Sequence, residues 1–360
     1  MSLDSYVTLG RSGLRISPFT LGTMTFGEDH GWGTSPQESN DILAAYLDRG
    51  GNSVDTANIY TNGHSEKIIG DYFAQKSSLR DSVVIGTKFF GNLYEKNPNG
   101  GGAGRKGIMQ QLENSLRRLQ TDYIDIYWLH NFDPATPVDE TMRTLDDLVT
   151  SGKVRYIGFS DVPAWRTAEA ATLAQFRGWT PIIALQLEYS LLERTSEGEL
   201  IPLAQAKGMG VLPWSPLKSG MLSGKYSSAN TGPVDTTRSA MVGTPSQRDY
   251  VVIDTLNEIA AEACASPAAV ALNWVNNRPG ISSTLVGARR LAQLEANLDA
   301  FAVNLTDTQR VTLDEVSAPT LNFPADNNRV LAAMLAFAGA TVDGQQTTVS
   351  PLLQANPTRY

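Results

Sequence analysis

Apolar positions along the chain follow two different periods. Short apolar runs alternate with longer stretches in which apolar residues recur every three or four positions, as on one face of a helix. A hairpin pattern, YVTL then RSG then LRIS, precedes them. Strands that alternate with helices predict a parallel sheet covered by helices. The eight predicted strands are residues 19–21, 53–54, 83–87, 124–129, 156–159, 182–185, 211–213 and 284–286.

Capping residues mark the ends of two predicted helices. One begins at Ser35, because Pro36 and Glu38 follow in a capping-box arrangement, with proline where its missing N–H needs no partner. Another begins near Thr136 and ends at Gly152. The predicted buried faces of four helices consist of Ile42, Leu43 and Tyr46; Ile108, Leu112, Leu116 and Leu119; Met142, Leu145, Leu148 and Val149; and Leu291, Leu294 and Leu298.

Eight strands with helices between them fit either a barrel or an open doubly wound sheet. An open sheet that binds a dinucleotide should carry G-x-G-x-x-G after its first strand, but the chain reads LGTMTFG there. The formal match at Gly102, Gly104 and Gly107 follows a long loop, so we interpret it as a flexible loop. We expect one α/β domain over residues 1–360: an N-terminal β-hairpin, a (β/α)8 TIM barrel over about 17–305 and a C-terminal helical extension over about 306–360.

A polar or aromatic residue stands at the C-terminal end of most predicted strands. Barrel enzymes build their active sites at that face, from residues of several strands. Each residue alone also has an ordinary explanation, such as a turn cap for Asp55, a solvated strand end for Lys88 or a hydrogen-bonded structural histidine for His130. The whole series favours a shared site. It consists of Asp55, Lys88, His130, Ser160, Asp161, Gln186 and Trp214.

Tyr60 adds a proton donor to this series, although an isolated tyrosine would more often serve loop packing. A tyrosine, a lysine and a carboxylate suit carbonyl reduction, because the alkoxide formed by hydride addition must take up a proton. Bringing the pKa of tyrosine from ~10 to ~7 requires about 4 kcal/mol, which a neighbouring ammonium and a second donor could supply. We expect Asp55 to pair with Lys88 and His130 to bind the carbonyl oxygen.

Charge and composition narrow the class of partner. The formal net charge is −8 and no run of five basic residues occurs, which argues against a nucleic-acid partner. No stretch approaches the ~20 apolar residues of a membrane span, and the start, MSLDSYVTLG, lacks the order of a signal peptide. The single cysteine, Cys264, is predicted to pack within a helix. We expect a cytoplasmic protein with a small-molecule substrate, no bound metal and no membrane partner; monomer and homo-oligomer stay open.

The stretch DTANIYTNGHSEKIIG, residues 55–70, resembles the signature of the aldo-keto reductase family. Further similar segments follow in order: IGTKFF, DIYWLHNFDPATPVDE, GKVRYIGFSD, LQLEYSLLER, LPWSPLKSGMLSGKY and VGARRLAQLEANL. The resemblance covers roughly residues 5–300, and the segment WSPLKSGMLSGKY resembles the branch of potassium-channel β subunits and bacterial NADP-dependent aldo/keto reductases. It implies a (β/α)8 barrel that binds NADPH or NADP+ and passes hydride between the nicotinamide and a substrate carbonyl, with Asp55, Tyr60, Lys88 and His130 as catalytic residues.

The resemblance also implies a set of cofactor-binding residues. Ser160, Asp161 and Gln186 would hold the carboxamide, and Trp214 would stack on the nicotinamide. A guanidinium suits phosphate geometry, so Arg289 beside Arg290 favours NADP. The remaining implied residues are Gly22, Thr23, Met24, Asp55, Ser215, Pro216, Leu217, Gly220, Leu222, Lys225, Arg238, Gly287, Gln293 and Asn297.

Two positions depart from the commonest family pattern. Many members have Asn at the position of Asp161, and a carboxylate can only accept hydrogen bonds, so cofactor binding there could be weaker or pH-sensitive. Many also have Tyr where this chain has Trp214.

Two other functions remain as alternatives. One is an NADP-binding regulatory subunit with little turnover; the presence of His130 favours an active enzyme instead. The other is a barrel glycosidase with Asp55 and Glu188 as its carboxylate pair, which leaves Lys88 and Tyr60 unexplained.

The substrate should be set by the barrel loops, at residues 24–32, 89–105 and 227–247, and by the tail beyond 324. Their aromatic residues would line an apolar pocket or pack on the surface. The expected substrates are aromatic aldehydes or a bulky alicyclic ketone such as a keto-mycotoxin. The aromatic candidates are Phe26, Trp32, Phe90 and Tyr94.

Overall fold

A computed structural model describes residues 1–230, 244–355 and 358 of the chain. Eight parallel strands form one sheet in the order β10-β3-β4-β5-β6-β7-β8-β9. The two strands at the ends of this order, β9 and β10, also approach each other, because Val211 of β9 forms a parallel bridge with Ile281, just before β10. The sheet is therefore a nearly closed TIM barrel. The strands are β3 (Phe19–Gly22), β4 (Ser53–Asp55), β5 (Val84–Phe89), β6 (Ile124–Leu129), β7 (Val154–Ser160), β8 (Ile182–Glu188), β9 (Gly210–Trp214) and β10 (Thr284–Gly287).

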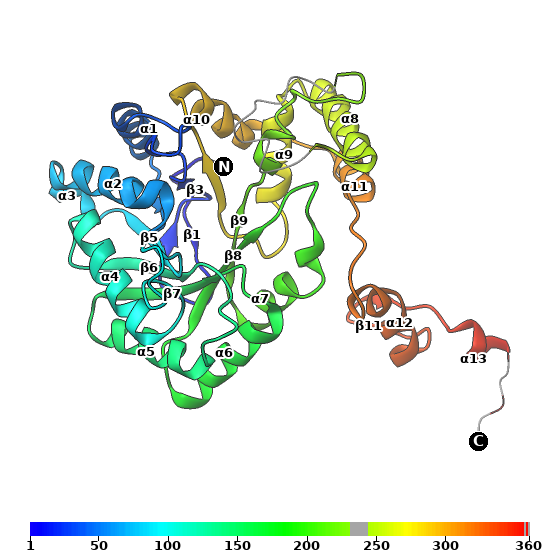
Figure 1. Cartoon of the computed structure of the whole chain (residues 1–360). Coiled ribbons are helices and arrows are strands. Elements are labelled where there is room, and N and C mark those ends of the chain that lie inside the picture. Colours follow the sequence, from blue (N-terminus) through cyan, green and yellow to red (C-terminus); the bar gives the residue numbers. More distant parts are fainter. Residues whose placement is uncertain (231–243, 356–357, 359–360) are drawn as a thin grey trace.

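Helices surround the barrel on its outer side (Figure 1). They bury their apolar faces in one large core cluster with the outward side chains of the strands. The helices are α1 (Pro36–Asp48), α2 (His64–Ala74), α3 (Ser77–Arg80), α4 (Arg105–Leu119), α5 (Val138–Thr150), α6 (Ala164–Arg177), α7 (Leu200–Lys207), α8 (Gln247–Glu262), α9 (Pro267–Asn276), α10 (Leu291–Leu298) and α11 (Asp307–Val316), with the short 3-10 turns η1 (Tyr60–Gly63), η2 (Thr195–Glu197), η3 (Lys218–Gly220) and η5 (Asp299–Ala302).

An antiparallel hairpin of β1 (Val7–Thr8) and β2 (Arg15–Ile16) lies at the N-terminal end of the barrel. Its Leu9 and Ile16 are buried in the same cluster as the side chains that fill the barrel interior. Gly10 has a φ of +55°, and a Cβ there would lie 2.2 Å from the carbonyl oxygen of Ile183. The backbone of the hairpin is therefore in direct contact with the backbone of β8, and the hairpin closes this end of the barrel.

The predicted strands and helix starts are confirmed. Most of the strand ends lie one or two residues from their predicted positions. The Ser35 side chain accepts from the backbone N–H of Glu38 at the start of α1. The predicted apolar faces of α1, α4 and α5 are buried, apart from Val149, which is half-buried. Of the predicted apolar face of α10 only Leu294 is fully buried, and Leu291, the first residue of the helix, is 40% exposed.

Two smaller expectations have different outcomes. Cys264 is exposed, not packed in a helix, because it lies with a φ of +52° in the turn between α8 and α9. The glycine-rich segment ends a long loop, as expected, and Gly104 is the N-cap of α4. The amides there are already bound, since Ala103 N donates to Asp133 and Arg105 N donates to Glu140. This helix start is no phosphate cradle.

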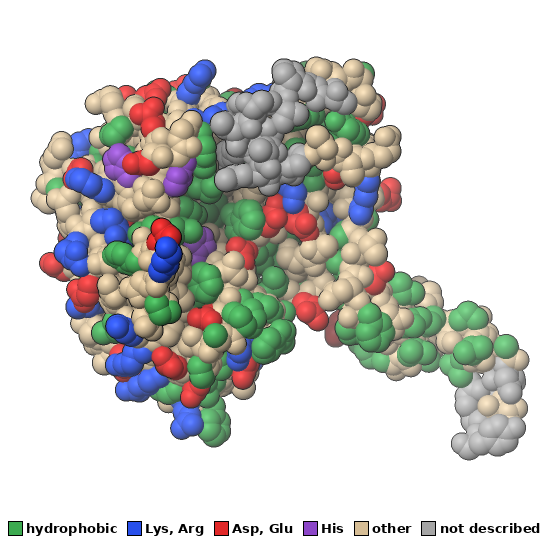
Figure 2. All heavy atoms as spheres, viewed as in Figure 1, with side chains coloured by type: hydrophobic (Ala, Val, Ile, Leu, Met, Phe, Trp, Pro, Cys, Tyr) green, Lys and Arg blue, Asp and Glu red, His purple; other side chains and the backbone are tan. Residues whose placement is uncertain are grey.

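The last part of the chain leaves the barrel. Helix α11 still packs on it, because Leu313 is fully buried and Asp314 pairs with Arg278. Beyond it come α12 (Ala325–Phe337), the short strands β11 (Thr341–Val342) and β12 (Gln345–Gln346), and α13 (Pro351–Ala355), with no residue of α12 buried. This segment stands away from the barrel (Figure 1), and hydrophobic side chains gather over it (Figure 2).

Candidate active site

A buried ion pair lies at the C-terminal ends of β4 and β5. Lys88 Nζ donates to Asp55 Oδ2, and neither side chain is more than 3% exposed. The ammonium also donates to the carbonyl oxygen of Thr56 at 2.8 Å. Gln186 Nε2 donates to the other carboxylate oxygen at 3.0 Å. Both charges are thus hydrogen-bonded as well as paired, which buried charges require.

Tyr60 and His130 complete the group predicted from the sequence. Lys88 Nζ donates to Tyr60 Oη at 3.0 Å and lies 4.6 Å from the centre of its ring. The rings of Tyr60 and His130 meet edge to face, with their centres 5.8 Å apart. The structure therefore brings together all four residues that the sequence named.

Local backbone geometry fixes this arrangement. Asp55 ends β4, and its carbonyl oxygen accepts from both the N–H and the hydroxyl of Thr23, at 2.9 Å each. Tyr60 begins η1, where Thr61 and Asn62 adopt positive φ angles of 45° and 57°. The chain therefore turns sharply behind Tyr60 before α2 begins.

The pKa of each group follows from burial and from its neighbours. Burial lowers the pKa of His130 to about 3, with Lys88 acting in the same direction, so the imidazole is neutral at pH 7. Burial alone would lower the pKa of Lys88, but Asp55 and Tyr60 outweigh it and raise that pKa. Burial raises the pKa of Asp55 despite Lys88. The lysine therefore stays an ammonium.

The expected fall in the pKa of Tyr60 is not found. Burial raises it, and this effect exceeds the opposite effect of Lys88; Asp55 and Asp161 raise it further. The neighbouring ammonium, which the sequence indicates, lowers the pKa of a phenol, but the loss of water around the buried phenol raises it. Tyr60 is therefore fully protonated at neutral pH, the form that a general acid requires.

A second polar group adjoins the first at the ends of β7, β8 and β9. Trp214 Nε1 donates to Asp161 Oδ1 at 3.0 Å, and Ser160 Oγ donates to Asp161 Oδ2 at 3.3 Å. Burial raises the pKa of Asp161 to about 6, although both hydrogen bonds lower it. Asp161 also has a φ of +52°, a conformation that Asp and Asn tolerate better than most residues. Asp161 therefore titrates near neutral pH.

The loop after β9 carries several of the predicted cofactor residues. Ser215 has a φ of +53°, and its hydroxyl accepts from Ser219 N at 3.1 Å. Lys218 Nζ lies 2.7 Å from Glu188 Oε1, which pins the loop to the end of β8. Because Lys218 neutralises Glu188 and Lys88 neutralises Asp55, the carboxylate pair of the glycosidase alternative is not free for acid-base chemistry.

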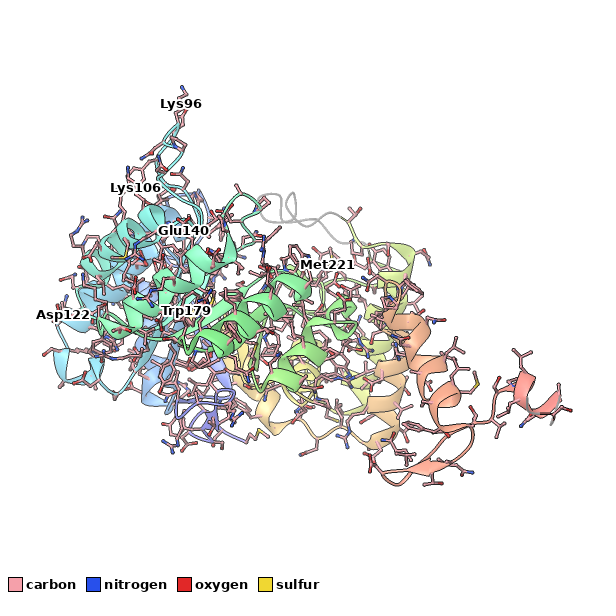
Figure 3. The ribbon with its side chains drawn as sticks, turned by 90° about the horizontal axis from the view of Figure 1, so that it is seen from below. Lys96, Lys106, Asp122, Glu140, Trp179 and Met221 are labelled. Carbon is pink, nitrogen blue, oxygen red and sulfur yellow. The ribbon has the colours of Figure 1, made fainter. Side chains whose placement is uncertain are left out.

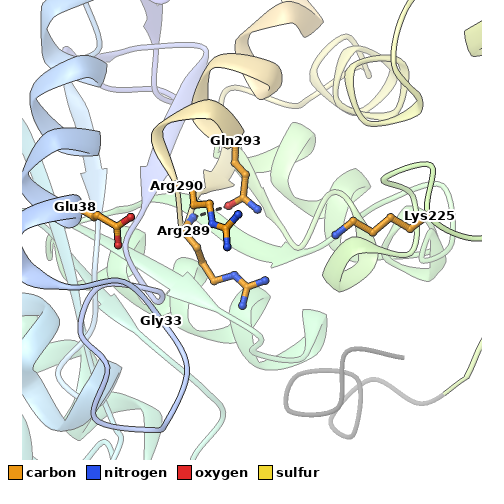
Figure 4. A pocket seen from close by; sticks show the side chains of 6 residues that line it. All are labelled: Gly33, Glu38, Lys225, Arg289, Arg290 and Gln293. Carbon is orange, nitrogen blue, oxygen red and sulfur yellow. Dashed lines mark hydrogen bonds between the residues drawn. The ribbon is translucent and has the colours of Figure 1, made fainter. Parts of the chain in front are cut away.

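A cavity of about 470 Å³ lies where this loop faces the turn between β10 and α10 (Figure 4). Arg289 and Arg290 project into it, and Lys225 approaches from the opposite side. Gln293 Oε1 accepts from the backbone N–H of Arg289 at 2.8 Å. Gly33 and Glu38 also line the cavity. Neither residue was predicted from the sequence to bind a ligand, and Glu38 already had a helix-capping role.

The other predicted cofactor residues divide by exposure. Exposed or half-buried positions at the barrel mouth are Gly22, Met24, Leu217, Gly220 and Gly287. Four predicted residues have buried side chains: Thr23, Pro216, Leu222 and Asn297. Such residues offer only backbone atoms to a ligand, or they support the site from behind. Asn297 Nδ2, for example, donates to the carbonyl oxygen of Gly287 at 3.3 Å. Arg238 lies outside the described residues.

The aromatic residues proposed for a substrate pocket also separate. Phe26 is fully buried in the core and cannot line a pocket. Phe90 packs partly on the core, Trp32 lies near His30, and Tyr94 is 40% exposed. The loop that holds Tyr94 extends outward to its tip near Lys96 (Figure 3). Residues 231–243 of the third predicted substrate loop lie outside the described part of the chain.

An eight-stranded parallel barrel whose C-terminal face holds a buried lysine–carboxylate pair, hydrogen-bonded to a half-buried tyrosine, defines the class of TIM-barrel enzymes. The chain belongs to the aldo/keto reductase family, because the sequence profile of that family matches residues 18–318. It is therefore an oxidoreductase.

Three relatives cover most of the chain. An uncharacterized oxidoreductase of Bacillus subtilis is 38% identical over 309 residues, 83% of this chain and 92% of that protein. A putative aryl-alcohol dehydrogenase of Saccharomyces cerevisiae is 33% identical, over 87% of this chain and 86% of that protein. A putative voltage-gated potassium channel subunit beta of Schizosaccharomyces pombe is 35% identical, over 88% of this chain and 92% of that protein.

Within the described part of the chain, no helix has the length and apolar character of a membrane span. The same residues contain no cluster of three or more His, Cys, Asp or Glu side chains suited to a metal ion.

Proposed function

We propose that the protein reduces an aldehyde or ketone to the alcohol with NADPH, with Tyr60 as the general acid. The observation that carries this proposal is the hydrogen-bonded chain from Asp55 through Lys88 to Tyr60. A buried ammonium beside a phenol stabilises the phenolate that remains after proton donation. Neutral His130, at the edge of the same ring, is placed to donate a hydrogen bond to the carbonyl oxygen.

The residues around the barrel mouth fit a phosphorylated dinucleotide. The cavity at the β10–α10 turn is lined by three basic side chains, which suit a 2′-phosphate. Trp214 at the end of β9 presents a half-buried indole, and its N–H is already bound to Asp161. When bound, NADPH supplies the hydride that reduces the carbonyl carbon. Ser160, Asp161 and Gln186 would hold the nicotinamide end.

We propose aromatic aldehydes as the first substrates to test, with bulky alicyclic ketones second. The resemblance to a putative aryl-alcohol dehydrogenase supports this order. The similarity to a putative channel β subunit supports a slow regulatory protein as the second candidate. Loss of NADPH absorbance over a panel of aldehydes and ketones separates the two. Multiple turnovers support the reductase, and tight NADPH binding with no turnover on any member contradicts it.

Arg289→Ala is expected to weaken NADPH binding by roughly tenfold or more and NADH binding little, because a lost charge-assisted hydrogen bond contributes about 1.5–3 kcal/mol. Dissociation constants for both cofactors, measured by quenching of tryptophan fluorescence, test this. Arg177→Ala, at an exposed arginine at the end of α6, is the matched control. Equal losses for the two cofactors would place Arg289 away from the 2′-phosphate.

NADP+ affinity is expected to rise relative to NADPH as pH increases through about 6, where Asp161 ionises. The carboxylate attracts the positive ring of the oxidised cofactor and not the neutral reduced ring. A single charge at this depth is worth roughly tenfold in the ratio. Titrations of both cofactors between about pH 5 and 8, from about one unit below that pKa to about two units above it, measure the ratio.

Asp161→Asn should flatten this ratio. The 2′-phosphate also titrates near pH ~6, but it is common to both cofactors and cancels in the ratio. A ratio that still changes with pH in Asp161→Asn would assign the titration to another group.

A further inference from the structure

The cavity at the β10–α10 turn is lined by charges of both signs. Arg289, Arg290 and Lys225 supply three positive charges, and Glu38 supplies a negative charge from the first turn of α1. Figure 4 shows the Glu38 carboxylate turned toward the two arginines. The carboxylate therefore faces any anion that the basic side chains attract.

Buried and surface contacts hold Glu38 beside the arginines. Thr34 Oγ1 donates to the carbonyl oxygen of Arg289 at 2.8 Å, and Thr34 is only 1% exposed. Near the other end of α1, an ion pair of 2.8 Å joins Arg49 to Glu295 of α10. The start of α1 is thus tied to the turn that carries Arg289, so the carboxylate cannot move away from the cavity without breaking a buried hydrogen bond.

Helix capping leaves the Glu38 carboxylate unused. In a complete capping box, the side chain at the third helical position accepts from the backbone N–H of the N-cap residue. Helices α8 and α11 form both halves of this box, whereas α1 forms only the half in which the Ser35 hydroxyl accepts from the Glu38 N–H. Within the described part of the chain, no group forms an ion pair or hydrogen bond with the Glu38 carboxylate. Its charge is therefore free to act on a ligand in the cavity.

We propose that Glu38 is a specificity-determining residue, which weakens the binding of a 2′-phosphate and so limits the preference for NADPH over NADH. The inference rests on the proposed function. A phosphate monoester carries a charge of about −1.5 to −2 at pH 7, whereas NADH has a neutral hydroxyl at the same position. Specificity is a difference of two affinities, and a repulsive group changes that difference as directly as an attractive one.

The size of the cavity sets the size of the effect. A round cavity of 470 Å³ is about 10 Å across, close to the Debye length of about 8–10 Å at physiological salt, so charges on its wall are only partly screened. Glu38 is exposed, so the dielectric constant of water applies to its interactions. A charge of −1 and a charge of about −2, some 10 Å apart in water, repel by an energy that corresponds to about fourfold in affinity.

The first test compares the two cofactors. Glu38→Gln removes the charge and keeps a residue suited to the third helical position. At about pH 8, where the 2′-phosphate is a dianion, the ratio of the dissociation constants of NADH and NADPH should rise about fourfold in Glu38→Gln at low salt. The difference from wild type should vanish near 1 M salt, where the Debye length is about 3 Å. Every charge that the two cofactors share cancels in the ratio.

Asp139→Asn is the matched control for Glu38→Gln. Asp139 is an exposed acidic residue in the first turn of α5, which follows β6, and three strands separate β6 from β10 in the sheet. Its removal should leave the ratio unchanged. A ratio that is also unchanged in Glu38→Gln, or that changes equally at low and high salt, overturns the inference.

The second test needs no turnover. Adenosine 2′,5′-bisphosphate and ADP differ by the 2′-phosphate and carry no nicotinamide, and calorimetry measures the affinity of each. Their affinity ratio should rise about fourfold in Glu38→Gln and about sixteenfold in Glu38→Lys, where the charge is reversed. An unchanged ratio in a protein that reduces carbonyls with NADPH overturns the inference alone. A wild-type protein that binds neither nucleotide overturns the proposed cofactor site as well.

Discussion

Tyr60→Phe should lower kcat for carbonyl reduction by roughly 10²–10⁴-fold, the usual contribution of a general acid. The hydroxyl is the only part removed, because phenylalanine keeps the ring that meets His130 edge to face and lies beside the Lys88 ammonium. The dissociation constant for NADPH should stay within a few-fold of its wild-type value. Single-turnover measurements of the absorbance band of the reduced nicotinamide, at about 340 nm, follow the chemical step separately from product release.

Tyr6→Phe is a matched control for this substitution. Its hydroxyl donates to the carbonyl oxygen of Gly50 on the surface, so its removal should leave turnover unchanged. Full turnover by Tyr60→Phe would show that another group donates the proton, and neutral His130 would be the next residue to test.

Lys88→Met is expected to abolish measurable reduction and to lower the free energy of unfolding by about 3–5 kcal/mol. Removing one partner of a buried pair leaves an uncompensated charge, here the carboxylate of Asp55 with 3% of its side chain exposed. Urea unfolding at pH 7, followed by fluorescence, measures the loss.

The loss of stability in Lys88→Met should shrink as pH falls. Without its partner, Asp55 has a folded-state pKa above its unfolded value, so the folded variant binds a proton more tightly than the unfolded chain. Stability is then greatest below the unfolded pKa of about 4 and is lost as pH rises through the folded pKa.

The double variant Asp55→Asn/Lys88→Met separates the two effects of Lys88. Both charges are gone, so most of the lost stability should return, while turnover should not. A double variant as unstable as Lys88→Met would attribute the instability to packing of the lysine stem and not to the carboxylate charge.

The sequence predicted the barrel and the grouping of these four side chains well, because both depend on local patterns. Strand and helix periods repeat along the chain, and residues that follow parallel strands must meet at one face. Asp55, Lys88 and His130 could therefore be grouped without knowing any contact. Tyr60 lies outside a strand, so its place in the group rested on the chemistry of carbonyl reduction and on the resemblance; the structure puts its hydroxyl 3.0 Å from Lys88 Nζ.

Features that depend on three-dimensional surroundings could not be predicted. The sign of the pKa shift of Tyr60 depends on the balance between burial and charge, and a sequence shows only the charge. Cys264 resembles a helical residue in sequence, yet α8 ends at Glu262 and Cys264 adopts a φ of +52° in the turn that follows. Glu38 lines the basic cavity because α1 begins beside the β10–α10 turn, a neighbourhood between residues far apart along the chain.

The hairpin at the N-terminal end gives the barrel the form of a cup with one opening. Leu9 and Ile16 close the base, and Trp128 and its apolar neighbours fill the space above it. Because the N-terminal end of the barrel is closed, both reactants of the proposed reaction must pass through the opening at its C-terminal end. The reactant that binds deeper in the barrel must therefore bind first. Bisubstrate kinetics should therefore follow a compulsory order, with the alcohol released before the dinucleotide.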